Sequence, residues 1–208
     1  YIRDIQASFG SDSLICQNGP YTFNAGASQD VYENCYRGYT WYFSDPGTRP
    51  ITTENPNEDI LFPVTGENEV TLEVTDINGC KDSISSLVRV FGIDTEFAAD
   101  EDTLCLPSVL VSFTDSTISD TTVTGWLWEF ENNLTANSQD TTHIFSGSTF
   151  NINPFDDDTI RVYLTATNIV GCESIDSVDI IVYKPISNIS SSDATICSGS
   201  DVTFNLEE

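Results

Sequence analysis

The sequence predicts an all-β protein made of two similar β-sandwich modules in tandem, followed by the opening of a third. Three observations support this prediction. Apolar and polar residues alternate with a period of two, turn-forming residues recur about every ten positions, and a cysteine pattern repeats after 92 residues. We find no amphipathic helical pattern.

The alternating segments mark the central strands of each module. In residues 70–75, Val70, Leu72 and Val74 share one face of a strand, because successive side chains point to opposite sides. Residues 108–114 and 159–167 alternate in the same way, and residues 178–183 are apolar enough for a strand buried on both faces. β-branched and aromatic residues are common throughout, as expected of a sandwich.

The cysteines define the length of the repeat. Cys80 and Cys172 each follow a glycine and lie 92 residues apart, and Cys105 and Cys197 have the same separation. Cys16 begins a third similar stretch, in which a cysteine and a short turn precede an alternating strand. We therefore predict modules at residues 1–91 and 92–184, and the opening strands of a third at 185–208.

One disulfide is expected within each complete module, because the first cysteine precedes an early strand and the second follows a late one. The expected pairs are Cys16–Cys80 and Cys105–Cys172, each stabilising its module by roughly 4 kcal/mol in the chain-entropy model.

Two cysteines are left over by this pairing. Cys197 would have no partner, and Cys35 is either a free thiol or bonded to Cys197. With one histidine and no C-x-x-C motif, the cysteines do not suggest a zinc site. Structural disulfides indicate an oxidising, extracytoplasmic location.

The chain is strongly acidic, with 33 acidic and 7 basic residues and a formal net charge of -26. Such a charge repels nucleic acids and anionic membrane surfaces and leaves cations and basic surfaces as partners. Hydrophobic residues make up 39% of the chain, so it is expected to fold despite its charge. No run of 18 apolar residues exists that would insert directly into a membrane.

A tryptophan marks a central strand in each module: Trp41 in "YTWYFSDPG" and Trp128 in "WLWEFENN". A tryptophan packed on a disulfide is typical of immunoglobulin-like sandwiches. Together with "ENPNEDILF", "VTLEVTDINGC", "HIFSG" and "VYLTATNIVGC", these segments resemble the polycystic kidney disease (PKD) domain family. The turn departs from the family pattern, because Ser44 and Glu131 stand where glycine is usual.

Cysteine-bearing arrays of this kind resemble the long, acidic surface proteins of Bacteroidetes, including gliding-motility adhesins exported by the type IX secretion system. The resemblance implies a non-catalytic, extracellular stalk or adhesive segment whose partners are surface glycans or proteins and neighbouring repeats of the same chain. The short apolar linkers at 88–94 and 182–187 favour semi-rigid stacking of the modules.

The alternative function is an accessory module of a secreted hydrolase that binds polysaccharide or protein. Such a site needs a row of exposed aromatic side chains, and Tyr36, Tyr39 and Tyr42 are the crowded candidates. We expect them to be partly in the core. The single histidine, His143, lies in an alternating strand and is expected to be structural, so no enzyme activity is predicted.

Calcium is the candidate cofactor, because hard cations need several oxygen ligands. One candidate site is the acidic loop with Asp156, Asp157 and Asp158, and the other lies around Asp45 and Asp59. An acidic run is more often a solvated loop, and no EF-hand pattern is present.

Glycosylation is a further prediction from the resemblance. Asp followed by Ser or Thr, and then by an apolar residue or threonine, is similar to the O-glycan acceptor motif of these bacteria, although Asp-Ser and Asp-Thr pairs are ordinary turn formers. The acceptor pairs begin at Asp12, Asp82, Asp102, Asp115, Asp120, Asp140, Asp158 and Asp176. Asn133 and Asn188 also fit the N-glycan acceptor pattern, which a bacterial source would leave unused.

Overall fold

A computed structural model describes residues 5–10, 14–30, 36–105, 108–146, 158–183, 188–191 and 204–207 of the chain. For residues 29, 30, 36, 37, 158, 188–191 and 204–207 it describes the backbone alone. Almost all regular structure in this part of the chain is β, as predicted. Its helical structure is one 3-10 turn, Glu131–Asn133, and no described helix has the length and apolar character needed to cross a membrane.

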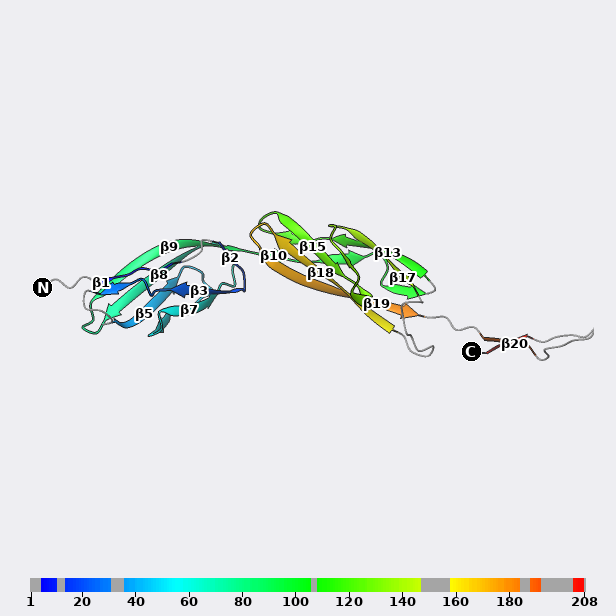
Figure 1. Cartoon of the computed structure of the whole chain (residues 1–208), viewed down its shortest axis with the longest axis horizontal. Coiled ribbons are helices and arrows are strands. Elements are labelled where there is room, and N and C mark those ends of the chain that lie inside the picture. Colours follow the sequence, from blue (N-terminus) through cyan, green and yellow to red (C-terminus); the bar gives the residue numbers. More distant parts are fainter. Residues whose placement is uncertain are drawn as a thin grey trace, which may run out of the picture. The chain divides into compact units, whose positions relative to one another are not determined.

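The first repeat folds into two facing sheets (Figure 1, blue to cyan). One sheet has the strand order β2-β9-β8-β5-β6, the other pairs β3 with β7, and β1 pairs with β4. The bounds are β1 Ile5–Gln6, β2 Leu14–Cys16, β3 Pro20–Asn24, β4 Gln29–Asp30, β5 Tyr36–Phe43, β6 Ile51–Thr53, β7 Asn57–Leu61, β8 Gly66–Asp76 and β9 Lys81–Phe91.

The long hairpin β8–β9 organises the larger sheet. Its ten paired positions run from Gly66↔Val90 to Thr75↔Lys81. At the far end of β9, the short strand β2 joins in parallel, which brings Cys16 opposite Phe91. Each other pair in this repeat is antiparallel.

The core between the two sheets is built by the alternating residues. Val70, Leu72 and Val74 of β8 are fully buried, as the period-two pattern predicts. They enclose Trp41 of β5, whose ring meets Phe9 and Phe23 edge-on or tilted, with centroids 5.2 and 5.5 Å apart. The tryptophan therefore packs on phenylalanine rings, and the expectation of a disulfide beneath it is wrong.

The second repeat has the same sheet order in its larger sheet, β12-β19-β18-β15-β16, and its facing sheet is β11-β13-β17. The short strands β10 and β14 form a separate pair. The bounds are β10 Ile93–Asp94, β11 Phe97–Ala99, β12 Thr103–Cys105, β13 Ser108–Asp115, β14 Ile118–Ser119, β15 Val123–Glu129, β16 Thr135–Ala136, β17 Thr141–Ser146, β18 Asp158–Asn168 and β19 Glu173–Tyr183.

The second core repeats the first. Trp128 is fully buried and packs edge-on against Phe97, with ring centroids 4.9 Å apart, and against Phe113 at 5.7 Å. Val162 and Leu164 of β18 enter the same core. Trp41 and Trp128 thus occupy equivalent places, as their sequence contexts predict.

By spatial contacts the chain divides into two compact units. One contains residues 1–94, 117–124 and 166–174, and the other contains 95–116, 125–165 and 175–208. Within the stretch predicted to open a third module, β20 (Asn188–Ser191) and β21 (Phe204–Glu207) form an antiparallel pair. The module boundaries at 91 and 184 stay a prediction.

Candidate functional site

The disulfide of the described residues joins Cys16 to Cys172. Their sulfur atoms are 2.11 Å apart and their Cα atoms 5.4 Å apart, 156 residues apart in sequence. Both cysteines belong to the first compact unit, which includes residues 166–174. Cys80 and Cys105 are free and exposed. The predicted pairs Cys16–Cys80 and Cys105–Cys172 are therefore wrong, and the bond connects one sequence repeat to the next.

Strand length explains why the predicted pairs cannot form. Cys16 lies beside Phe91, the last residue of β9, whereas Cys80 directly precedes Lys81, the first residue of that strand. Eleven residues of extended chain separate these positions by about 35 Å, far beyond the roughly 7 Å between Cα atoms that a disulfide tolerates.

The second repeat has the same geometry. Cys105 lies beside Tyr183 at the end of β19, and Cys172 directly precedes Glu173 at its beginning. The two cysteines of each repeat therefore lie at opposite ends of the larger sheet. A signal for this was present in the sequence, namely the long strand-like run that follows each Gly-Cys.

The Gly-Cys turn before β19 is closed by Asn168, whose side chain is almost fully buried. Its Oδ1 accepts hydrogen bonds from the backbone N–H groups of Val170 (3.1 Å) and Cys172 (3.0 Å). The Asn168 N–H donates to the Cys172 carbonyl at 3.0 Å, and Gly171 has a φ of +93°, which favours glycine. This turn holds Cys172 in its bonded position.

The turn before β9 is built in the same way around Asp76. Its Oδ1 accepts from the N–H groups of Asn78 (2.7 Å) and Cys80 (2.8 Å), and Gly79 has a φ of +84°. Burial alone would raise the pKa of Asp76, but the hydrogen bonds from Cys80 and Asn78 outweigh this effect and lower its pKa. The carboxylate form is therefore the one that closes the turn.

A compact polar contact lies around Gly92 in the first unit. The Gly92 N–H donates to Asp120 Oδ2 at 2.8 Å, and Ser119 Oγ donates to the Gly92 carbonyl at 3.0 Å. A Cβ at Gly92 would lie 2.7 Å from Thr65 Cγ2 and 3.1 Å from Gln17 Oε1. Any larger residue at position 92 would therefore require the Thr65 side chain to shift.

Of the two candidate calcium sites, the structure describes the side chains of only one. The side chains of Asp156, Asp157 and Asp158 lie outside the described residues. Asp45 is buried, and its oxygens accept hydrogen bonds from Gly47 N–H (2.9 Å) and Thr48 Oγ1 (2.7 Å).

Asp59, the other residue of the second candidate site, accepts a hydrogen bond from Thr22 Oγ1 across the β3–β7 pair. Nowhere in the described part of the chain do three or more His, Cys, Asp or Glu side chains converge as metal ligands would. Calcium binding stays a prediction.

His143 lies in β17 and is held by packing. Its ring stacks on Phe130 with centroids 4.2 Å apart and meets Phe145 edge-on at 4.7 Å. Its Nε2 is 2.9 Å from Glu131 Oε1, and both side chains are mostly buried. These contacts support the structural role expected of His143. Glu131 Oε2 is buried without a hydrogen-bond partner among the described residues.

The candidate aromatic row is not formed by the tyrosines whose side chains are described. Tyr39 is buried in the first core, whereas Tyr42 is 42% exposed. The two side chains point to opposite faces of β5, because their positions differ by an odd number. Burial raises the pKa of Tyr39. The side chain of Tyr36 lies outside the described residues, as does Cys35, and Cys197 does as well.

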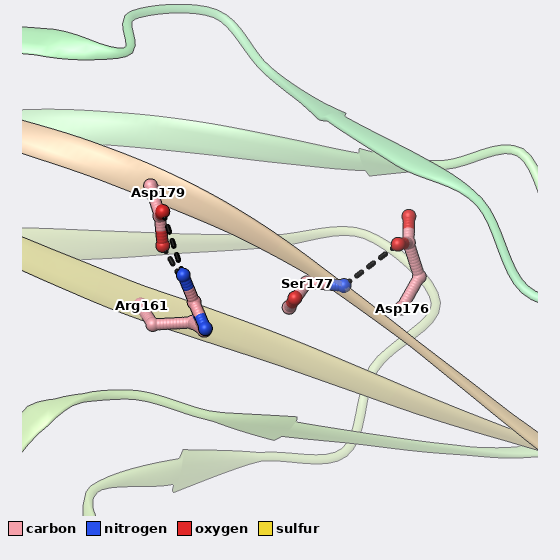
Figure 2. A network of polar contacts seen from close by, with 4 residues as sticks. All are labelled: Arg161, Asp176, Ser177 and Asp179. Carbon is pink, nitrogen blue, oxygen red and sulfur yellow. Dashed lines mark hydrogen bonds and ion pairs between the residues drawn. The ribbon is translucent and has the colours of Figure 1, made fainter.

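Exposed polar side chains form contacts on the larger sheet of the second repeat (Figure 2). Arg161 on β18 binds Asp179 on β19 through two hydrogen bonds, from Nε to Oδ1 at 2.6 Å and from Nη2 to Oδ2 at 2.8 Å. This pairing lowers the pKa of Asp179. Nearby, Asp176 Oδ1 accepts from the Ser177 N–H at 2.7 Å, and Ser177 is exposed. Ser177 is thus an accessible member of the predicted O-glycan acceptor set.

Similarity to known proteins is found among solved structures. No protein-family model and no curated protein sequence matches the chain. Among solved structures, the chain is similar to the fibronectin(III)-like modules of CbhA from Clostridium thermocellum, with 11% identity, a TM-score of 0.38, and coverage of 86% of this chain and 94% of that one.

Two further solved structures show a similar likeness. One is a 1.5-MDa bacterial ice-binding adhesin, with 12% identity, a TM-score of 0.35, and coverage of 91% of this chain and 66% of that one. The other comprises the N-terminal domains of the Highly Immunogenic Outer Capsid protein of bacteriophage RB49, with 10% identity, a TM-score of 0.40, and coverage of 88% and 70%. The strand order and the two hydrophobic cores of the chain's own structure show an immunoglobulin-like β-sandwich in each repeat.

Proposed function

We propose that residues 1–208 form a non-catalytic repeat segment of a large extracellular adhesin, which acts as a spacer or adhesive stalk in attachment or gliding. The observation that carries the proposal is the Cys16–Cys172 bond, which joins two repeats of the same sandwich. A bond of this kind keeps neighbouring repeats covalently connected when the chain is pulled, which suits a stalk. It also favours an oxidising, extracytoplasmic location.

The surface chemistry supports the same function. The net charge of -26 keeps neighbouring copies apart and disfavours adsorption to anionic surfaces. His143 is held by packing and lies in no arrangement of nucleophile and base among the described residues. The resemblance to PKD domains of Bacteroidetes gliding-motility adhesins extends the proposal to that class of surface protein and to type IX secretion.

The accessory-module alternative has less support. It requires exposed aromatic side chains in a row, and Tyr39 is buried while Tyr42 is exposed on the other face of the same strand. A polysaccharide pull-down with the wild-type chain and with Tyr42→Ala as a matched control separates a pure spacer from a module that binds polysaccharide. A spacer retains no polysaccharide in either form. Retention by the wild type that Tyr42→Ala abolishes would favour the accessory module.

Surface labelling in the native host tests the proposal directly. An antibody raised against residues 1–208 should stain intact cells, and brief treatment of those cells with an external protease should remove the stain. Staining that requires permeabilised cells would overturn the proposal.

A further inference from the structure

The exposed thiols of Cys80 and Cys105 are the repeat equivalents of the two bonded cysteines. Cys80 stands where Cys172 stands in the next repeat, and Cys105 stands where Cys16 stands in the preceding one. The bonded Cys172 is 2% exposed, whereas Cys80 and Cys105 are exposed. Cys80 and Cys105 therefore lack the cysteine partner that their bonded equivalents have.

The structural equivalence of Cys80 and Cys172 is detailed. Each cysteine N–H donates to the side-chain oxygen of the residue four positions earlier, Asp76 at 2.8 Å and Asn168 at 3.0 Å. Each cysteine carbonyl accepts from the N–H of that same residue, at 2.9 and 3.0 Å. The turn at Cys80 therefore has the same hydrogen bonds as the turn that holds the bonded Cys172.

The equivalence of Cys105 and Cys16 rests on strand register. Each ends a three-residue strand that runs parallel to the last strand of its repeat. Cys16 lies opposite Phe91, and Cys105 lies opposite Tyr183, the final residues of β9 and β19. Both cysteines therefore stand at the end of the larger sheet from which the chain passes to the next repeat.

We propose that Cys80 and Cys105 are half-sites for disulfides with neighbouring repeats of the same kind. Cys105 bonds to the Gly-Cys of the following repeat, and Cys80 bonds to the early cysteine of the preceding one. Every junction of the array then carries one covalent bond equivalent to Cys16–Cys172. The inference rests on the proposed function only in its assumption that more repeats flank these two.

The bond forms by thiol–disulfide exchange with a disulfide oxidant, such as oxidised glutathione. The Cys105 thiolate attacks one sulfur of the oxidant and releases one glutathione thiolate. The thiolate of the neighbouring repeat's cysteine then attacks the mixed disulfide at the Cys105 sulfur and releases the second. Two protein thiols lose two protons and two electrons, and the oxidant ends as two thiols.

A chimeric chain tests the Cys105 half-site. In this chimera, residues 1–208 are followed by a copy of residues 117–184. Cys197 lies 92 residues after Cys105, so residue 208 corresponds to residue 116 and the copy continues the third repeat in register. After refolding in a glutathione redox buffer, peptide mapping by mass spectrometry without reduction should find Cys105 linked to the copied Cys172. A link between Cys197 and the copied Cys172, or a free Cys105, would overturn the proposal. The Cys105→Ser chimera is the matched control, in which the copied cysteine should react with a thiol reagent.

A second chimera tests the Cys80 half-site with an additional copy of the second repeat. A copy of residues 93–184 is placed ahead of residue 5, and Cys80 should become linked to the Cys105 of the copy. A Cys80–Cys35 bond, or a Cys80 that stays reactive in the folded chain, would overturn the proposal at this end. Neither map depends on adhesion or on cell-surface location, so failure here and failure of the proposed function are distinguishable.

Discussion

Replacing each core tryptophan by phenylalanine tests the packing, because Trp41 and Trp128 differ in the hydrogen bond of their indole N–H groups. Trp128 Nε1 donates a hydrogen bond to the Ser138 carbonyl at 2.9 Å, whereas Trp41 Nε1 is buried without a partner among the described residues. Both side chains are fully buried. Trp41→Phe and Trp128→Phe therefore remove the same apolar surface and differ in one polar interaction.

The magnitudes follow from burial and hydrogen bonding. The smaller ring gives up about 40 Å² of buried apolar surface in each case, which destabilises the repeat by about 1 kcal/mol. Trp128→Phe also loses the hydrogen bond to the carbonyl of Ser138, an exposed residue, which adds about 1 kcal/mol. Trp41→Phe removes an unpaired buried N–H, whose desolvation penalty of about 1 kcal/mol disappears and offsets the lost surface. We expect losses of about 2 kcal/mol for Trp128→Phe and near zero for Trp41→Phe.

The assay is urea unfolding followed by circular dichroism, with hydrogen-exchange mass spectrometry to assign each change to its repeat. Trp128→Phe should lower the hydrogen-exchange protection of its own repeat, whereas Trp41→Phe should leave the protection of its repeat nearly unchanged. Equal losses in the two variants, or a larger loss for Trp41→Phe, would refute the reasoning.

Four more substitutions test the junction and the turns. Cys172→Ser opens a loop of 156 residues and should lower the free energy of unfolding by about 5 kcal/mol in the chain-entropy model. Cys16→Ser removes the same bond and should cause the same loss. A loss below about 1 kcal/mol in urea unfolding would contradict the bond. Asp76→Asn keeps a side-chain acceptor in the turn but removes a carboxyl group whose pKa is lowered in the folded state. The stability advantage of the wild type is therefore present above about pH 4 and is lost as the pH falls through the folded pKa. Acid unfolding curves that stay parallel for the two proteins would contradict this. Gly92→Ala places a Cβ 2.7 Å from Thr65 Cγ2 and should destabilise the chain by about 2 kcal/mol, whereas an unchanged melting temperature would show that the contact relaxes.

The fold could be predicted from the sequence because its determinants are local. Alternation in Val70, Leu72 and Val74 specified the buried face of β8, and Trp41 and Trp128 marked equivalent strands. Tyr39 was expected to be partly in the core, and its burial follows from the same period of two. These features depend on neighbours within one strand.

The disulfide pairing could not be predicted with the same rule, because it depends on which end of the sheet each cysteine reaches. Cys16 is beside Phe91 because β2 joins β9 in parallel, and that choice is made by packing between segments 75 residues apart. The lengths of β9 and β19 contained the missing constraint.

The role of Asp45 was also not visible in the sequence. An acidic residue in a loop suggests a cation ligand, yet this carboxylate is buried and bound to Gly47 and Thr48 of its own turn. Its role depends on the conformation of the turn, which the residue type alone does not specify.

In this chain a disulfide joins Cys16, the early cysteine of one repeat, to Cys172 in the Gly-Cys pair of the next. Non-reducing peptide mapping of residues 1–208, produced in an oxidising compartment, is the decisive experiment for this bond. We expect a cross-linked peptide that contains Cys16 and Cys172, with Cys80 and Cys105 open to alkylation in the folded chain. Cross-linked peptides that join Cys16 to Cys80 and Cys105 to Cys172 would contradict it.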